Sequence, residues 1–189
     1  MNESILAETV SPEVRRRAEK IKVLLMDVDG VLTDGKLFYM VAADGSVFET
    51  KGFNSHDGIG LHLLNHFGLA TGVISGRESP ATVERARILK MKYVYQGLLA
   101  KEGAYQEVLA DAGVDEDQVA FVGDDFTDVP LMVRSGLGIA VANARPEVLG
   151  AAHYITAARG GDGAVREVAE LLLKAQGHWA ETLEKYRLA

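Results

Sequence analysis

The chain has 189 residues, enough for one sizeable hydrophobic core and short for two. Its net charge of −7 argues against nucleic acid or an anionic membrane as the main partner, because either would require a basic face. The absence of cysteine excludes disulfides and thiolate sites and fits a cytoplasmic location. We expect neither a signal peptide nor a membrane span, since no window shows the required apolar run.

Short apolar or β-branched runs alternate with helical patterns along most of the chain. The alternation predicts an α/β fold, a doubly wound parallel sheet of the Rossmann-like type. Residues 1–19 are interpreted as a partly helical N-terminal extension, and residues 20–189 as one domain. Strands are predicted at 21–26, 69–75, 92–96, 119–124, 137–142 and, at an edge, 153–156; helices are predicted at 58–67, 79–90, 100–113, 126–136, 144–152 and 163–186, the last being the longest.

Residues 37–53 break this alternation. Two β-rich arms flank Asp44-Gly45, a dipeptide typical of hairpin turns. The pattern predicts a β-hairpin that projects from the sheet. The intervals from Asp27 to Ser75 and from Ser75 to Lys101 hold no further segment large enough for a separate cap domain.

Polar side chains follow the first four predicted strands of the sheet. Carboxyl ends of parallel strands share one edge, so these groups are expected to converge there. The first strand leads to Asp27 and Asp29, the second to Ser75, Gly76 and Arg77, the third to Lys101, and the fourth to Asp124, Asp125 and Asp128.

Clustered carboxylates repel one another at neutral pH unless they share protons or bind a cation. Oxygen ligands without His or Cys favour a hard ion, and Mg²⁺ suits such a site best. A cation beside a hydroxyl and an ammonium forms a phosphate site. Asp27 can then attack phosphorus, and Asp29 can protonate the leaving oxygen and later activate water.

Four motifs carry a resemblance to a known family. DVDGVLTDG, ISGR, QGLLAK and GDDFTD stand in the order and spacing found in the haloacid dehalogenase-like (HAD-like) phosphohydrolases. FNSHDGIG, VERARIL and ITAARGGDGAVREVAELLLKAQG look like the 3-deoxy-D-manno-octulosonate 8-phosphate phosphatases, the KdsC group. The resemblance covers about residues 20–178.

The resemblance implies a role for each motif residue. Asp27 would be the nucleophile and Asp29 the general acid and base, with Ser75 and Lys101 on the phosphoryl group. Mg²⁺ would be held by Asp27, the carbonyl of Asp29 and Asp124. Asp125 and Asp128 would support the metal, and the substrate would be bound by Asn54, Ser55, His56, Asp57, Gly58, His62, Gly76, Arg77, Arg85 and Lys101.

The resemblance also implies a reaction and an assembly. The expected reaction removes phosphate from 3-deoxy-D-manno-octulosonate 8-phosphate in lipopolysaccharide precursor synthesis. The expected assembly is a homotetramer in which hairpins pack together and a neighbour covers each site. The chain departs from familiar members at His56 and His62, where they carry arginines, and histidine does not keep its charge at alkaline pH.

Several alternatives remain open. A nine-carbon sialic-type acid 9-phosphate is a second candidate substrate, and a non-catalytic phosphatase-like regulatory module is a second candidate class. A phosphoacceptor receiver domain is disfavoured because no Asp follows the third strand, and zinc at His62 and His66 is disfavoured because no Glu lies between them. Residues 160–163, GGDG, are typical of a flexible helix start or, by the resemblance, of a segment near the site.

Overall fold

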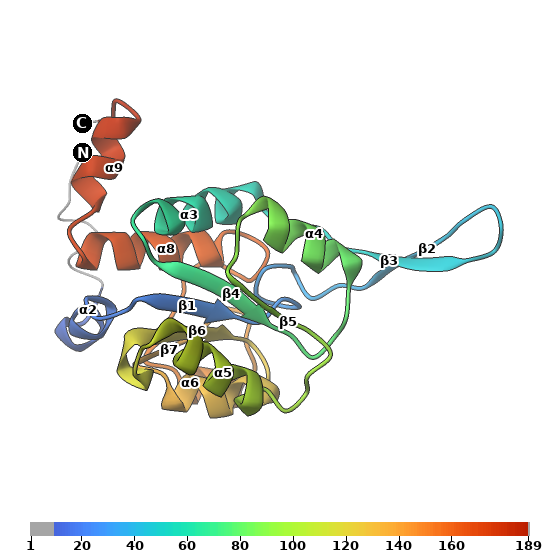
Figure 1. The fold of residues 1–189 in the computed structure, drawn as a ribbon, viewed down its shortest axis with the longest axis horizontal. Coiled ribbons are helices and arrows are strands. Elements are labelled where there is room, and N and C mark those ends of the chain that lie inside the picture. Colours follow the sequence, from blue (N-terminus) through green and yellow to red (C-terminus); the bar gives the residue numbers. More distant parts are fainter. Residues whose placement is uncertain (1–9, 189) are drawn as a thin grey trace.

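A six-stranded parallel sheet forms the centre of the molecule in the computed structural model, which describes residues 10–188. The strand order is β5-β4-β1-β6-β7-β8, and helices cover both faces (Figure 1). The predicted doubly wound parallel sheet is confirmed. Its strands are β1 (Val23–Met26), β4 (Ala70–Ile74), β5 (Tyr93–Tyr95), β6 (Val119–Gly123), β7 (Leu137–Ala140) and β8 (Tyr154–Ile155).

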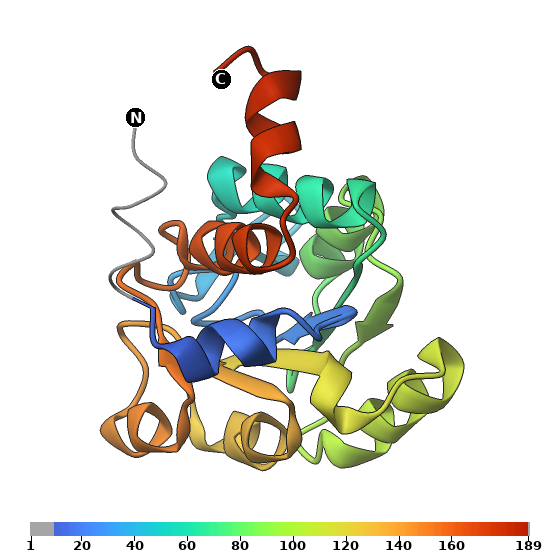
Figure 2. The same cartoon turned by 90° about the vertical axis from the view of Figure 1, so that its left-hand side faces the viewer.

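The helices form a layer on each face of the sheet. Helices α3 (Ser55–His66), α4 (Pro80–Ile88) and α8 (Ala164–Ala175) lie on one face, and α5 (Glu102–Ala112), α6 (Val129–Arg134) and α7 (Pro146–Ala151) lie on the other (Figures 1 and 2). Because both faces are covered, β1 and β6 are apolar and buried throughout. None of the helices within residues 10–188 is long and apolar enough to cross a membrane.

The strand order reverses at β1. Strands β4 and β6 flank β1 in parallel, with Met26 opposite both Val73 and Val122. The chain builds β4 and β5 on one side of β1 and returns to build β6, β7 and β8 on the other. Ligands of open α/β sheets bind at such a reversal, beyond the carboxyl ends of the strands. Asp27 occupies this position directly after β1.

The predicted hairpin is confirmed as a separate two-stranded antiparallel sheet. Strands β2 (Phe38–Val41) and β3 (Val47–Thr50) project from the body of the molecule (Figure 1). Gly45 adopts a φ of +82° in the turn, where a residue with a Cβ would be strained. Apart from this hairpin, α3 is the one helix or strand that the structure describes between β1 and β4.

Helix ends differ from the sequence-based prediction by one to three residues at most helices, and at two of them single residues explain the difference. Helix α3 begins three residues early, at Ser55, because the Asn54 side chain accepts a hydrogen bond from the His56 N–H at 2.8 Å and caps the helix. The prediction of one longest helix over 163–186 was wrong. Gly177, with a φ of +78°, separates α8 from α9 (Trp179–Lys185), and α8 has 12 residues, as many as α3.

The N-terminal extension is helical where the structure describes it. Helix α2 (Pro12–Ala18) places Val14 and Ala18 in the same buried apolar cluster as β1. Residues 1–9 of the predicted extension lie outside the described residues. The division at residue 20 stays a prediction. The remaining elements are two short 3₁₀ helices, η1 (Glu116–Gln118) and η2 (Phe126–Asp128).

Candidate active site

Three carboxylates meet at the carboxyl ends of β1 and β6. Asp27 follows β1, Asp124 follows β6, and Asp128 ends η2. One carboxylate oxygen from each lies within 4.8 Å of the others. The Asp27 N–H donates to the Val122 carbonyl at 3.0 Å, so pairing with β6 fixes the backbone position from which the Asp27 side chain extends. The predicted convergence of strand-end carboxylates is therefore confirmed for these three.

Two glycines let the carboxylates approach the backbone this closely. A Cβ on Gly30, whose φ is +94°, would lie 2.0 Å from Oδ2 of Asp124. A Cβ on Gly123 would lie 2.3 Å from Cβ of Asp128. Any larger residue at either position would displace a carboxylate from the cluster.

A buried lysine partly neutralises the cluster. The Lys101 ammonium donates a hydrogen bond to Oδ1 of Asp128 at 2.7 Å and lies 3.1 Å from Oδ1 of Asp27. Oδ2 of Asp128 accepts from the backbone N–H groups of Asp124 at 3.0 Å and Asp125 at 3.2 Å. Asp128 therefore has partners on both oxygens, and it fixes Lys101 and the loop after β6.

The other two carboxylates lack such partners. Oδ1 of Asp124 is buried without a hydrogen bond, and Oδ1 of Asp27 has only the ion-pair contact with Lys101. Burial, with the charges of Asp128 and Asp27, raises the pKa of Asp124 to about 8. Burial and the charge of Asp128 raise the pKa of Asp27 to about 6. Burial is the larger cause of both shifts, and repulsion from the neighbouring acids adds to it.

An oxygen-only donor set with buried, unpartnered carboxylate oxygens fits Mg²⁺. Asp27 and Asp124 have the oxygens available to hold it, and the cation would neutralise phosphoryl oxygens placed beside them. Asp125 lies at the rim, where its Oδ1 accepts from the Phe126 N–H at 2.7 Å and caps η2. The predicted ligation by the Asp29 carbonyl and the supporting role of Asp125 stay predictions.

Ser75 and its neighbours border the cluster from β4. Ser75 is buried, its N–H donates to the Tyr95 carbonyl at 2.9 Å, and its hydroxyl accepts from the Arg77 N–H at 3.3 Å. Gly76 turns the chain beside Leu99, and Arg77 is exposed. The loop after β4 thus presents a hydroxyl and a guanidinium at the same sheet edge as Asp27.

The predicted substrate residues on α3 divide into two groups. Ser55, His56 and His62 are exposed, whereas Asp57 and Gly58 are buried. Oδ1 of Asp57 accepts from the Arg166 N–H at the start of α8 at 2.8 Å, and burial raises the pKa of Asp57. A Cβ on Gly58 would lie 2.7 Å from the Arg85 guanidinium. Asp57 and Gly58 therefore join α3 to its neighbours.

Asn54 connects the start of α3 to residues 160–163, and Arg85 holds the Asn54 backbone. Arg85 donates to the Asn54 carbonyl at 2.9 Å and lies over the Phe53 ring. The Asn54 side-chain amide donates to the Gly161 carbonyl at 3.4 Å. Substrate contacts by Asn54 and Arg85 stay predictions.

Sequence reasoning missed two contributions to the site. Lys51, at the base of the hairpin, contacts both Asp29 and Glu49, and nothing in an alternating β-arm marks a lysine as buried. Residues 160–163, for which the sequence allows either a flexible helix start or a place near the site, pack on the loop after β1. The Gly161 N–H donates to the Val31 carbonyl at 2.9 Å, and a Cβ on Gly160 would lie 1.6 Å from the Gly30 carbonyl oxygen.

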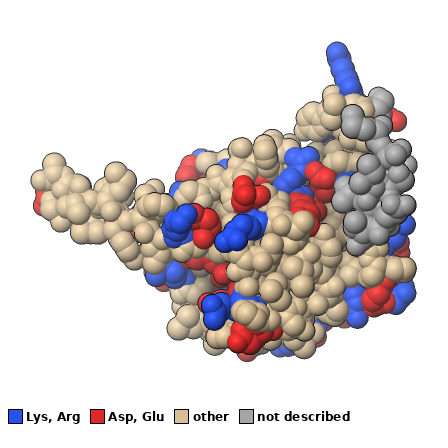
Figure 3. Space-filling model, turned by 180° about the vertical axis from the view of Figure 1, so that it is seen from behind, with Lys and Arg blue, Asp and Glu red and all other residues tan. Residues whose placement is uncertain are grey.

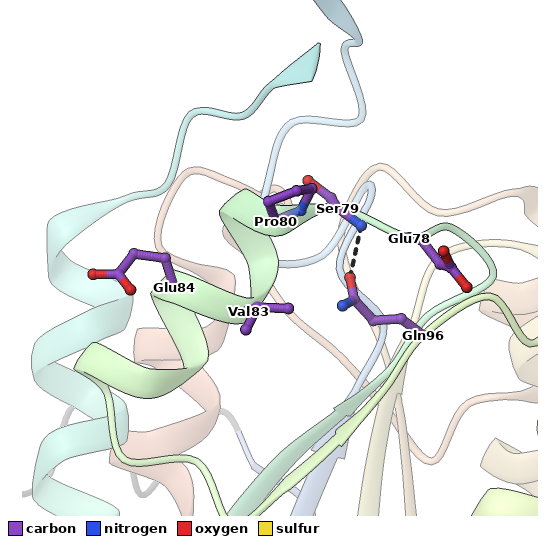
Figure 4. Close-up of a pocket in the computed structure, with 6 residues that line it drawn as sticks. All are labelled: Glu78, Ser79, Pro80, Val83, Glu84 and Gln96. Atoms are coloured by element: carbon purple, nitrogen blue, oxygen red, sulfur yellow. Dashed lines mark hydrogen bonds between the residues drawn. The ribbon is translucent and has the colours of Figure 1, made fainter. Parts of the chain in front are cut away.

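A separate hollow of about 450 Å³ lies at the start of α4 (Figure 4). Gln96 reaches from the end of β5 and accepts a hydrogen bond from the Ser79 N–H at 2.9 Å. None of the predicted catalytic residues lines this hollow, and its walls include Glu78 and Glu84. The carboxylate cluster, and not this hollow, is the candidate active site.

Comparisons with known proteins agree with the fold and the site. The sequence profile of the haloacid dehalogenase-like hydrolases matches residues 91–168. The 3-deoxy-D-manno-octulosonate 8-phosphate phosphatase KdsC of Yersinia pestis is 44% identical over 167 residues, covering 88% of this chain and 87% of that protein. The chain is thus a haloacid dehalogenase-like hydrolase.

Two solved structures narrow the family to which the chain belongs. A probable YrbI-family phosphatase from Pseudomonas syringae superposes with a TM-score of 0.88 at 43% identity, over 93% of this chain and 98% of that chain. The 3-deoxy-D-manno-octulosonate 8-phosphate phosphatase of Moraxella catarrhalis, in complex with magnesium ion, phosphate ion and a KDO molecule, gives 0.86 at 36% identity, over 92% and 98%. The chain belongs to the 3-deoxy-D-manno-octulosonate 8-phosphate phosphatase (KdsC) family.

We expect Mg²⁺ to raise the melting temperature of the protein, because the cation relieves repulsion within the folded cluster. At 100 times its Kd, a ligand stabilises the native state by about 2.7 kcal/mol, or about 5–10 °C for a chain of this size. Asp124→Asn should lose most of this shift. The exposed Asp117→Asn, which alters an ion pair with Lys20, should retain it. An unchanged shift in Asp124→Asn would place the cation elsewhere.

Proposed function

We propose that the protein is a Mg²⁺-dependent phosphomonoesterase that removes phosphate from 3-deoxy-D-manno-octulosonate 8-phosphate, a step in lipopolysaccharide precursor synthesis. The observation that carries the proposal is the position of Asp27 beside Asp124, Asp128 and Lys101 at the reversal of the strand order. The family relationship supports the sugar substrate, since the Yersinia and Moraxella proteins carry that name.

Asp27 is the nucleophile in the proposed reaction. A carboxylate oxygen of Asp27 bonds to phosphorus as the bond from phosphorus to the sugar oxygen breaks. Asp29 gives its proton to that leaving oxygen, and the sugar departs as an alcohol. Mg²⁺, when bound, supplies positive charge to the phosphoryl oxygens.

In the second step of the proposed reaction, Asp29 acts as a general base. It takes a proton from water as the water oxygen bonds to phosphorus and the bond from phosphorus to Asp27 breaks. Inorganic phosphate leaves, Asp27 is again a carboxylate, and Asp29 again carries a proton. Lys101 and Ser75 hold the phosphoryl group through both steps, and Lys101 keeps its charge because the carboxylates of Asp27 and Asp128 outweigh burial and raise its pKa.

The sugar is bound by the exposed face of α3 and the loop after β4 in this proposal. His56, His62 and Ser55 are open to solvent on α3, and Arg77 is exposed on the loop. A second candidate substrate is the 9-phosphate of a nine-carbon sialic-type acid, which differs from the eight-carbon acid by one carbon at the end of the chain.

Comparative phosphate release is the test of this function. We expect the eight-carbon 8-phosphate to give a higher kcat/KM than the nine-carbon 9-phosphate, with both reactions abolished by chelating Mg²⁺. Asp27→Asn should have no turnover, and Asp29→Asn should lose at least ~10²-fold, the usual scale for a general acid. A higher kcat/KM for the nine-carbon substrate would reassign the sugar. Turnover by Asp27→Asn would contradict the covalent route.

We further propose that the protein is a homotetramer that works in the cytoplasm. The hairpin exposes a run of large apolar side chains, and Figure 3 shows the projecting arm as mostly uncharged. Its outer residues are 50–72% exposed at Val41, Val47 and Phe48. An apolar surface of this kind favours association. Packing of hairpins would let a neighbouring subunit cover the open site and shield the phosphoryl intermediate from stray water.

The assembly is tested by light scattering. We expect a mass of about 82 kDa, four times 20.4 kDa. Phe48→Lys should reduce the mass, because Phe48 pairs with Met40 across the hairpin and both are about half exposed. Val133→Lys, at an equally exposed apolar position on α6, should leave the mass unchanged. A fully active monomer of the parent protein would contradict the shared site.

A further inference from the structure

Lys51 is a buried ammonium outside the four motifs. It follows β3 at the base of the hairpin, and its side chain is 1% exposed. A buried charge persists only when opposite charges and hydrogen bonds compensate it. Two carboxylates do so here: Lys51 donates its hydrogen bond to Oδ1 of Asp29 and lies 3.1 Å from Oε1 of Glu49.

Arg77 closes a ring of alternating charges with these three residues. Its guanidinium donates to Oε2 of Glu49, and its Nε lies 3.6 Å from Oδ2 of Asp29. The ring runs from Asp29 to Lys51, Glu49, Arg77 and back to Asp29. Although burial opposes it, the hydrogen bonds from Arg77 and Lys51 hold the pKa of Glu49 below its ordinary value.

The ring treats the two oxygens of Asp29 differently. Oδ1 is held by the Lys51 ammonium, whereas Oδ2 is buried and has no hydrogen-bond partner among the described residues. Asp29 is also kept out of the Asp27, Asp124 and Asp128 cluster, although only one residue separates it from Asp27. A group that must give and take one proton needs one anchored oxygen and one that remains available.

We propose that Lys51, supported by Glu49 and Arg77, is a positioning residue that anchors Oδ1 of Asp29 and leaves Oδ2 available for proton transfer. The inference rests on the proposed function and adds to it a contribution from the hairpin. The base of the hairpin carries two charged residues of the ring, so the arm whose outer part is apolar also orients the general acid and base.

The test separates attack by Asp27 from the proton transfers of Asp29. Nitrophenolate leaves phosphorus without needing a proton, so its release in a single turnover, with enzyme in excess over nitrophenyl phosphate, reports attack alone. Steady-state hydrolysis of the 8-phosphate sugar requires Asp29 in both steps. In Lys51→Met we expect the single-turnover rate to stay within about threefold of the parent and steady-state kcat to fall at least ~10-fold.

Two further variants complete the design. Lys51→Arg keeps the charge and should recover part of the lost kcat. Lys92→Met removes an exposed lysine that pairs with Asp111 at 2.8 Å, and it should leave both rates unchanged. The Mg²⁺-induced shift in melting temperature should persist in Lys51→Met, because Lys51 contacts none of Asp27, Asp124 and Asp128. If Lys51→Met does not fold, Glu49→Gln should also lower steady-state kcat more than the single-turnover rate, by a smaller factor.

Equal losses in both rates, or a kcat within twofold of the parent, would overturn the role of Lys51. The parent protein is measured first to keep the two proposals apart. A parent that releases no phosphate from either substrate contradicts the proposed function. An active parent whose Lys51→Met variant lacks the asymmetry contradicts only the positioning role.

Discussion

Repulsion among buried carboxylates is the constraint on which this structure depends. Asp27, Asp124 and Asp128 bring oxygens within 4.8 Å of one another at the ends of two adjacent buried strands. Such crowding is unfavourable in water and more so when burial removes solvent. Three features of the surrounding structure reduce this repulsion. Lys101 is buried between Asp27 and Asp128, and backbone N–H groups donate hydrogen bonds to Asp128. Glycines leave room for Asp124. A divalent cation would balance the negative charge that remains, and it could then hold a phosphoryl group beside Asp27.

The two ends of the hairpin are built differently. Its outer part is apolar and exposed, which is unfavourable for an isolated chain and favours association. Its base is charged: the buried Lys51 side chain pairs with Asp29 and Glu49, and Glu49 also pairs with the exposed Arg77. The hairpin therefore joins an exposed apolar surface to residues that contact Asp29. Between β1 and β4 the structure therefore has this hairpin and α3, and the hairpin base carries two members of the charged ring.

Much of this arrangement could be predicted from the sequence. Strand positions, the hairpin and the convergence of Asp27 and Asp124 follow from local patterns, because apolar runs define strands and parallel strands end at a common edge. Helix ends depended on single side chains and torsions, as at Asn54 and Gly177. Lys51 and the glycines at 160 and 161 could not be placed, since their burial arises from contacts with loops far away in sequence. The location of a substrate on α3 is likewise a matter of tertiary contacts and stays a prediction.

In the proposed reaction Asp27 carries the phosphoryl group during turnover, and trapping that group on the protein is the most direct test. Parent protein mixed with substrate and Mg²⁺ is quenched in acid within one turnover, the acyl phosphate is reduced with borohydride, and the modified residue is located by peptide mass spectrometry. The covalent route through Asp27 predicts that this residue is converted to homoserine, with no such product in the absence of substrate. Modification at another residue, or none while phosphate is released at the full rate, would contradict it.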